Sequence, residues 1–100
     1  MTKSFRESLT EDRRLVMLRL LAEVEGYEAN SSVLQSALAS FGHTMSRDSV
    51  HTELAWLAEQ GLITSTPMVT IVVAKLTARG LDAAQGHATV PGVKRPGPGA

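Results

Sequence analysis

The chain has 100 residues, of which 43% are hydrophobic and 20% charged, as in ordinary soluble domains with one core. Ten basic and ten acidic residues give a formal net charge of zero, whereas a nucleic-acid binder usually carries a basic surplus. The longest apolar run, MVTIVVA, is too short to cross a bilayer, and the N-terminus lacks the apolar core of a signal peptide. We therefore expect a cytoplasmic protein with no membrane segment.

A first helix is predicted from Glu11 to about Glu25. The segment Ser8-Leu9-Thr10-Glu11 has the spacing of a capping box, and acidic residues follow where a helix N-terminus favours negative charge. Gly26 is expected to end the helix. Residues 1–9 are then left as a flexible N-terminal arm.

This first helix carries two apolar stripes. The first is sufficient for a small core and consists of Val16, Met17, Leu20, Leu21 and Val24. The second consists of Leu15, Leu18 and Ala22. Either the C-terminal part of the chain covers the second stripe, or the stripe is a subunit contact, and the sequence leaves both open. The first helix is accordingly the best candidate for a dimer element, and its Arg13 and Arg14 are interpreted as a solvated face.

Two further helices are predicted in quick succession. Asn30-Ser31-Ser32 followed by Gln35 is a second cap, and apolar residues then recur at helical spacing until Gly42. After the short connection His43-Thr44-Met45, Ser46 caps a helix over residues 46–60, with Gly61 just past its end. Helices joined by so short a turn indicate a helix-turn-helix unit.

The periodicity changes after Gly61. Residues 62–65 and 69–74 are rich in β-branched side chains and flank Pro67, which predicts a β-hairpin, or wing. A last helix is predicted over residues 78–85, capped by a threonine and closed by a glycine. Residues 87–100, HATVPGVKRPGPGA, are rich in proline and glycine and are expected to form a disordered tail that supplies no core.

Two local sequences resemble winged helix-turn-helix regulators of the ArsR and MarR type. SVHTELAWLAEQGLI looks like the junction between recognition helix and wing, and KLTARG looks like the step from the last wing strand into the following helix. The resemblance covers residues 10–86 and implies a mainly α fold with a small β-hairpin (α+β), in the order α-α-α-β-β-α, followed by a flexible tail. The small size and the PGVKRPGPG ending also resemble winged-helix proteins of Mu-like phages and prophages.

The resemblance implies a small transcriptional regulator, dimeric, that inserts the helix 46–60 in the major groove of double-stranded DNA. The DNA-contacting positions of the family fall here on Ser46, Arg47, Ser49, His51 and Thr52. Only Arg47 offers a permanent charge among them. Between Ser46 and Gln60 one arginine stands against three acids, a formal charge of −2 that would repel phosphate.

That charge favours an alternative, a winged-helix module that has lost DNA binding and holds a protein instead. The candidate dimer or partner surface consists of Leu15, Leu18, Ala22 and Trp56, with the PGVKRPGP segment as a further candidate. Trp56 lies well off the helix face that contains Leu54 and Leu57. It either packs under the wing or against the first helix, or it belongs to a partner surface, where tryptophan is enriched.

Catalysis and cofactor binding are not expected. The three histidines have no i, i+4 pair among them, and no cysteine is present to bind a soft metal. The serines are concentrated at helix starts, where capping accounts for them, and no glycine-rich phosphate loop occurs. The sequence therefore predicts neither an enzyme nor a metal site.

Overall fold

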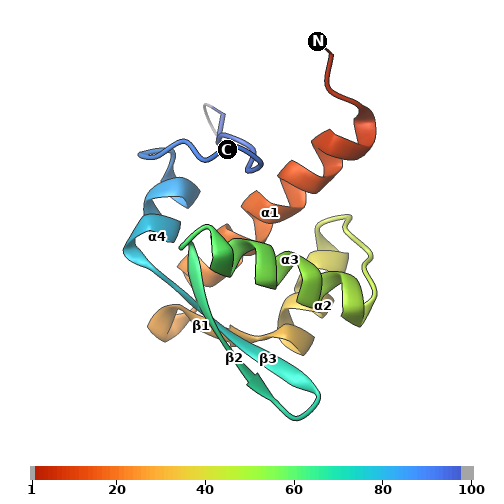
Figure 1. Ribbon diagram of the computed structural model, residues 1–100, viewed down its shortest axis with the longest axis vertical. Helices are drawn as coiled ribbons and strands as arrows, with labels where there is room; N and C mark the ends of the chain where they lie inside the picture. The colour runs from red at the N-terminus through yellow and green to blue at the C-terminus, as the bar shows by residue number, and fades with distance from the viewer. Residues whose placement is uncertain (1, 98–100) are drawn as a thin grey trace.

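The computed structural model describes residues 2–97, which form a small three-stranded sheet and a group of helices (Figure 1). The helices are α1 (Phe5–Glu23), the short 3-10 helix η1 (Glu25–Tyr27), α2 (Ser31–Ser40), α3 (Arg47–Glu59) and α4 (Ala78–Gln85). The strands are β1 (Glu28–Asn30), β2 (Ile63–Met68) and β3 (Ile71–Leu76). None of the helices in the described part has the length and hydropathy that crossing a membrane requires.

The predicted helix-turn-helix, hairpin and last helix are confirmed, and their caps explain their boundaries. The side chains of Asn30, Ser46 and Thr77 each accept a hydrogen bond from the backbone N–H three residues later, at 2.9, 3.1 and 3.0 Å. Each bond satisfies a backbone donor that has no partner within its helix. The sequence therefore specifies where α2, α3 and α4 begin.

Helix α1 begins earlier than predicted, at Phe5. Its capping box is formed by Ser4 and Glu7, in which the Ser4 hydroxyl accepts from the Glu7 N–H at 3.1 Å. Both Ser4 and Ser8 have an acid three residues later, so the capping pattern fits either start. Nothing between them breaks a helix, and the earlier start gains a further turn of hydrogen bonds. Much of the segment expected to be an arm is therefore helical.

The chain between α1 and α2 also differs from the prediction. Helix α1 ends at Glu23, before the predicted Glu25, and Gly26 lies within η1 at a φ of 78°. Strand β1, which was not predicted, follows directly and pairs with β3. It has only three residues, one of which is the cap of α2, so it shows no alternating pattern. Only its pairing with a distant strand reveals it.

The sheet has the order β1-β3-β2, with antiparallel pairing throughout. In the hairpin, Ile63 lies opposite Leu76 and Met68 lies opposite Ile71, so that only Val69 and Thr70 form the turn. The hairpin protrudes at the end of the molecule opposite the N-terminus (Figure 1). The fold thus presents a helix-turn-helix beside a projecting wing.

The hydrophobic core takes residues from both stripes of α1. Leu15 and Leu18 are 2% and 0% exposed, as buried as Met17 and Leu21, while Val16 and Leu20 are only partly buried. The prediction that Leu15 and Leu18 form a dimer or partner surface is therefore wrong, because the chain itself covers them. Ala22 is partly buried against the core.

Part of the predicted tail packs onto the domain. Val90 and Val93 belong to the core and are 3% and 8% exposed. The Lys94 N–H donates to the Glu11 carbonyl of α1 at 3.1 Å. The expectation that the tail supplies no core is therefore wrong, because two valines suffice to dock a proline-rich and glycine-rich segment. Residues 98–100, the end of this predicted segment, lie outside the described residues.

We predict that Gly80→Ala strongly destabilises the fold. A Cβ at Gly80 would collide with the Leu62 carbonyl oxygen and would lie 2.7 Å from Leu76 Cδ1. Overpacking of this kind costs about 1–3 kcal/mol and sometimes more. Urea denaturation would measure the loss of unfolding free energy, with Gln85→Ala on the exposed side of α4 as the control. Equal stability of Gly80→Ala and the control would contradict this packing.

Candidate nucleic-acid interface

Helix α3 has one face in the core and one in solvent. Val50, Leu54 and Leu57 are at most 1% exposed, which confirms the predicted inward face. Helical geometry then places Asp48, Thr52, Ala55 and Glu59 on the opposite side, and all four are exposed. This outer ridge is small and polar, and the hairpin follows directly after α3 (Figure 1).

Four of the five predicted DNA-contacting residues fall into two pairs. Ser46 and Ser49 engage each other at the start of α3, where the Ser46 hydroxyl accepts from the Ser49 N–H and donates to the Ser49 hydroxyl at 3.0 Å. Arg47 and Thr52 are exposed. The cap thus occupies part of the hydrogen-bonding capacity of both serines, while Arg47 and Thr52 present their side chains to solvent.

The fifth predicted residue, His51, links three elements. Its Nε2 is hydrogen bonded to the Ser31 hydroxyl at 3.0 Å, and the same hydroxyl accepts from the Val72 N–H at 3.0 Å. Ser31 is 3% exposed. His51 therefore connects α3 to the start of α2 and to β3, which fixes the angle between the helix-turn-helix and the wing.

Arg47 lines a polar hollow of about 280 Å³. The hollow lies where the first turns of α2 and α3 meet the hairpin, and its other lining residues are Ser31, Ser32, Gln35, Thr70 and Ile71. Gln35 also donates to the Met45 carbonyl at 2.9 Å, which holds the connection between α2 and α3. Sequence reasoning missed Ser32, Gln35 and Thr70 at this position, because only the fold brings α2 and the wing together.

The exposed face of α3 carries less negative charge than the count over residues 46–60 suggests, because one of the three acids is buried. Glu53 is buried on the side of α1, where its Oε1 accepts from Arg14 Nε at 2.8 Å. Their side chains are 12% and 16% exposed, respectively. The exposed charges of α3 are then Arg47, Asp48 and Glu59, a formal sum of −1. The repulsion of phosphate expected from the sequence is therefore smaller on the exposed face.

Arg14 and Trp56 form the contact that anchors the tail. The Arg14 guanidinium lies 3.8 Å from the centre of the Trp56 ring, and its second nitrogen donates to the Gly92 carbonyl at 3.0 Å. Gly92 has a φ of 94°. Of the two interpretations of Trp56, packing against the first helix is the one observed. The interpretation of Arg14 as a solvated residue is wrong, because its side chain is hydrogen bonded to Glu53 and Gly92. These partners lie 39 and 78 positions away, so no local pattern in the sequence indicates them.

A second polar contact joins the tail to α1. His43, which is 5% exposed, bonds through Nε2 to Asp12 Oδ2 at 2.7 Å, and Lys94 reaches the other oxygen at 3.4 Å. Partial burial alone would raise the pKa of Asp12, but the bonds to His43 and Lys94 outweigh it and hold the pKa below 3.8. In residues 2–97 no group of three His, Cys, Asp or Glu side chains is placed to hold a metal ion.

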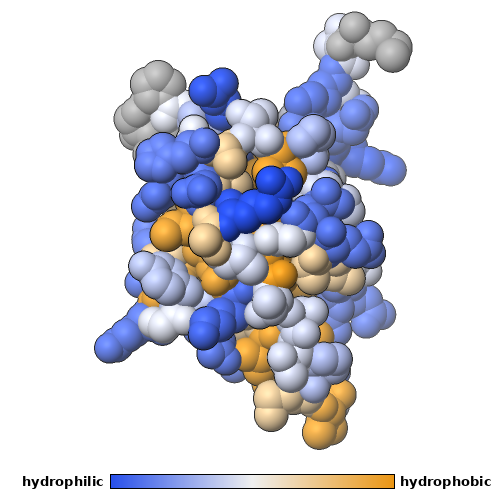
Figure 2. All heavy atoms as spheres, turned by 60° about the vertical axis from the view of Figure 1, so that its left-hand side comes forward, coloured by the Kyte–Doolittle hydropathy of each residue, from blue (hydrophilic) through white to orange (hydrophobic). Residues whose placement is uncertain are grey.

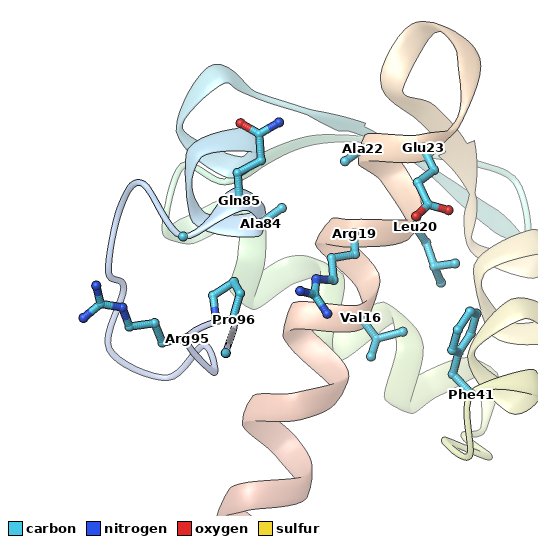
Figure 3. A pocket seen from close by; sticks show the side chains of 12 residues that line it. Val16, Arg19, Leu20, Ala22, Glu23, Phe41, Ala84, Gln85, Arg95 and Pro96 are labelled. Atoms are coloured by element: carbon cyan, nitrogen blue, oxygen red, sulfur yellow. The ribbon is translucent and has the colours of Figure 1, made fainter. Parts of the chain in front are cut away.

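An apolar groove of about 1,070 Å³ lies on the other side of α1 (Figure 3). Val16 and Leu20 of α1 and Phe41 at the end of α2 form one side, and Ala84 and Pro96 form the other. Phe41 is 62% exposed. Arg19 and Glu23 add opposite charges to the lining. The apolar residues that α1 exposes in this groove, Val16 and Leu20, thus belong to the first stripe, which the sequence pattern assigned to the core.

No family model matches the chain. A protein of Escherichia phage Mu described as "Uncharacterized protein gp26" is 52% identical over 90 residues, which are 90% of this chain and 93% of the phage protein. The chain belongs to the phage Mu gp26 family. The resemblance to proteins of Mu-like phages is thereby confirmed. An uncharacterized protein of Haemophilus influenzae is 54% identical over 61 residues, 61% of this chain and 59% of that protein.

The solved structures include a similar fold, that of Lactococcus lactis ZitR, a double mutant in apo form. Its TM-score is 0.59 at 28% sequence identity, and the match covers 83% of this chain and 58% of ZitR. The chain thus spans little more than half the length of ZitR. Together with the helix-turn-helix and the hairpin, this match confirms the winged-helix fold of the chain.

We predict that Gly92→Ala releases the tail from α3. A Cβ at Gly92 would lie 2.7 Å from the Trp56 ring and 3.0 Å from the Arg14 guanidinium, and its φ of 94° disfavours alanine. Trp56 is the chain's single tryptophan, so its fluorescence reports the change directly. We expect the emission to shift to longer wavelength as the ring becomes hydrated.

Gly97→Ala is the matched control, because a Cβ there meets nothing within 4 Å. Unchanged emission in both variants would show that the tail does not cover Trp56 in solution.

Proposed function

We propose that the protein is a small DNA-binding regulator that places the exposed face of α3 in the major groove. The observation that carries this proposal is the setting of Arg47. It lies in the first turn of α3, whose outer face is exposed and polar, and it lines a polar hollow together with residues of α2 and the wing. Hydroxyl, amide and guanidinium groups that converge beside two helix N-termini are well suited to a phosphate of the DNA backbone.

The geometry supports distinct roles for the residues of this face. Arg47 and Ser32 would hold a phosphate and thereby set the register of the protein on the duplex. Thr52 and Ala55 would approach the base edges, where a small side chain can contact a thymine methyl group. Asp48 would accept from a cytosine amino group, which is the base contact open to an acidic side chain. Ser46, Ser49 and His51 would then act chiefly by fixing α3.

The protein-interaction alternative has lost most of the residues expected to form its surface, although the net charge of zero that favoured it remains. Trp56 packs against Arg14 and the tail, and Leu15 and Leu18 lie in the core. Glu53, one of the three acids that argued against DNA, is paired with Arg14 inside the domain. DNA binding is therefore the function that the arrangement supports best.

We further propose that two copies associate through the groove beside α1. The groove places the exposed ring of Phe41 next to Val16 and Leu20, which gives an apolar centre. Arg19 and Glu23 lie one helical turn apart. If a two-fold axis relates two antiparallel α1 helices, Arg19 of each copy lies next to Glu23 of the other, and the opposite charges can pair. Such self-complementarity fits a second copy of the same chain.

Arg47→Ala is expected to weaken DNA binding about tenfold, because it removes one charged phosphate contact. Fluorescence anisotropy of a labelled duplex at several salt concentrations measures this effect. The slope of log Kd against log salt should also become shallower by about one.

Arg6→Ala is the control for Arg47→Ala, since Arg6 is an exposed arginine in the first turn of α1 and lies outside the proposed interface. Equal affinities and slopes for the two variants would exclude the proposed position of Arg47. A wild-type protein that binds no duplex at low salt, including sites selected from a random pool, would exclude the function itself.

Phe41→Asp is expected to dissociate the proposed dimer, because it places a charge in the apolar centre of the interface. The dissociation constant of the dimer should rise at least about tenfold, as for the central residues of an interface. Analytical ultracentrifugation provides the measurement, and Phe5→Asp, which changes another exposed phenylalanine, is the control. A wild-type protein that sediments as a monomer at all concentrations would contradict this interface.

A further inference from the structure

The tip of the wing exposes apolar side chains. Met68 is 54% exposed and Val69 is 107% exposed, and the neighbouring Pro67 is also exposed. In Figure 2 hydrophobic residues occupy the lower end of the molecule, where Figure 1 places the turn between β2 and β3. Three consecutive apolar side chains at the tip of a hairpin, away from the hydrophobic core, do not contribute to the packing of the domain.

The turn also holds Val69 in a strained backbone conformation. Its φ is 51°, in the left-handed region that β-branched residues rarely adopt. A hairpin turn of two residues is ordinarily closed by asparagine or glycine at such a position, without this steric cost. Strain of this kind is found mainly where a side chain is required for function. The turn therefore keeps an apolar side chain at the expense of its own stability.

The outer part of the hairpin is uncharged. From Leu62 to Ala74 the chain contains no Asp, Glu, Lys or Arg. The one charged side chain of the hairpin, Lys75, lies near its base, opposite Thr64. The tip therefore has no cation to attract phosphate and differs from the basic arms that track a groove by charge. What the tip offers to DNA is shape and apolar surface, and apolar side chains including methionine and proline act in this way when they enter between base pairs from the minor groove.

We propose that Met68 and Val69 form a wedge that enters the minor groove and kinks the duplex. This inference rests on the DNA binding proposed above. Because β2 continues from α3 through Gly61, a helix seated in the major groove carries the hairpin towards the adjacent minor groove. Partial unstacking of a base step by the wedge bends the DNA and brings more of it against the protein. The step most easily opened is a flexible pyrimidine–purine step, which becomes part of the recognised sequence.

Energy transfer between dyes at the two ends of a bound duplex tests the wedge. Wild-type protein should shorten the distance between the ends, and the double variant Met68→Ser/Val69→Asn should bind about tenfold more weakly and leave the duplex straight. Asparagine tolerates the left-handed conformation, so the variant hairpin should fold at least as stably. Phe5→Ser, which changes an exposed apolar residue at the other end of the molecule, should bend DNA as wild type does.

The outcomes separate the wedge from the function on which it rests. Salt-dependent binding without bending, or equal bending by the double variant, would overturn the wedge and leave DNA binding intact. Absence of any duplex binding by the wild type would overturn both. With p-benzoylphenylalanine in place of Val69, photo-crosslinking to the duplex supports the wedge. Crosslinking to a protein alone, in a mixture that contains the duplex, would overturn it in favour of a protein-binding wing.

Discussion

Arg14 makes the contact on which the arrangement of α1, α3 and the tail depends. Its guanidinium binds the Glu53 carboxylate, lies over the Trp56 ring and donates to the Gly92 carbonyl. An ion pair that is mostly removed from water yields little net stability, but the loss of one partner leaves an uncompensated charge and costs up to about 3–5 kcal/mol. Because Arg14 has to contact Glu53, Trp56 and Gly92 at the same time, α1, α3 and the tail can meet in one arrangement only. Gly92 satisfies that requirement because no side chain fits between its backbone and the ring.

The same contact changes the electrostatics of the proposed DNA interface. Glu53 is the one acid of α3 that the domain buries, and its charge is balanced on the side of the helix that faces α1. The outer ridge keeps Asp48 and Glu59, so the exposed face of α3 is still mildly acidic. Affinity from phosphate neutralisation must then come from few positions, of which Arg47 is the one on α3. A protein of this kind would depend more on shape and on base contacts than a strongly basic winged helix does.

The wing and the helix divide the proposed recognition between them. The helix side is polar, with hydroxyl and amide groups around Arg47, whereas the tip of the hairpin is uncharged and ends in Met68 and Val69. His51, Ser31 and Val72 connect the two parts by hydrogen bonds, so the angle between helix and hairpin is set within the domain. A rigid angle allows the two surfaces to act on one duplex at the same time, because neither has to be ordered on binding.

Local chemistry along the chain is sufficient to specify several of the elements. Caps at Asn30, Ser46 and Thr77 and β-branched runs around Pro67 were sufficient for α2, α3, the hairpin and α4, and the resemblance supplied their arrangement as a winged helix. A local rule failed at α1, where two capping boxes fit and hydrogen bonding favoured the longer helix.

Which faces are covered and which charges are paired depends on the packing of whole elements. Strand β1, the burial of Leu15 and Leu18, the docking of the tail and the Arg14–Glu53 pair all depend on partners far apart in the chain. The hollow around Arg47 likewise appears only when α2 and the wing meet. Periodicity and capping describe neighbours within a few residues, whereas burial and ion pairing depend on how whole elements pack, and for that reason the sequence pattern could not specify them.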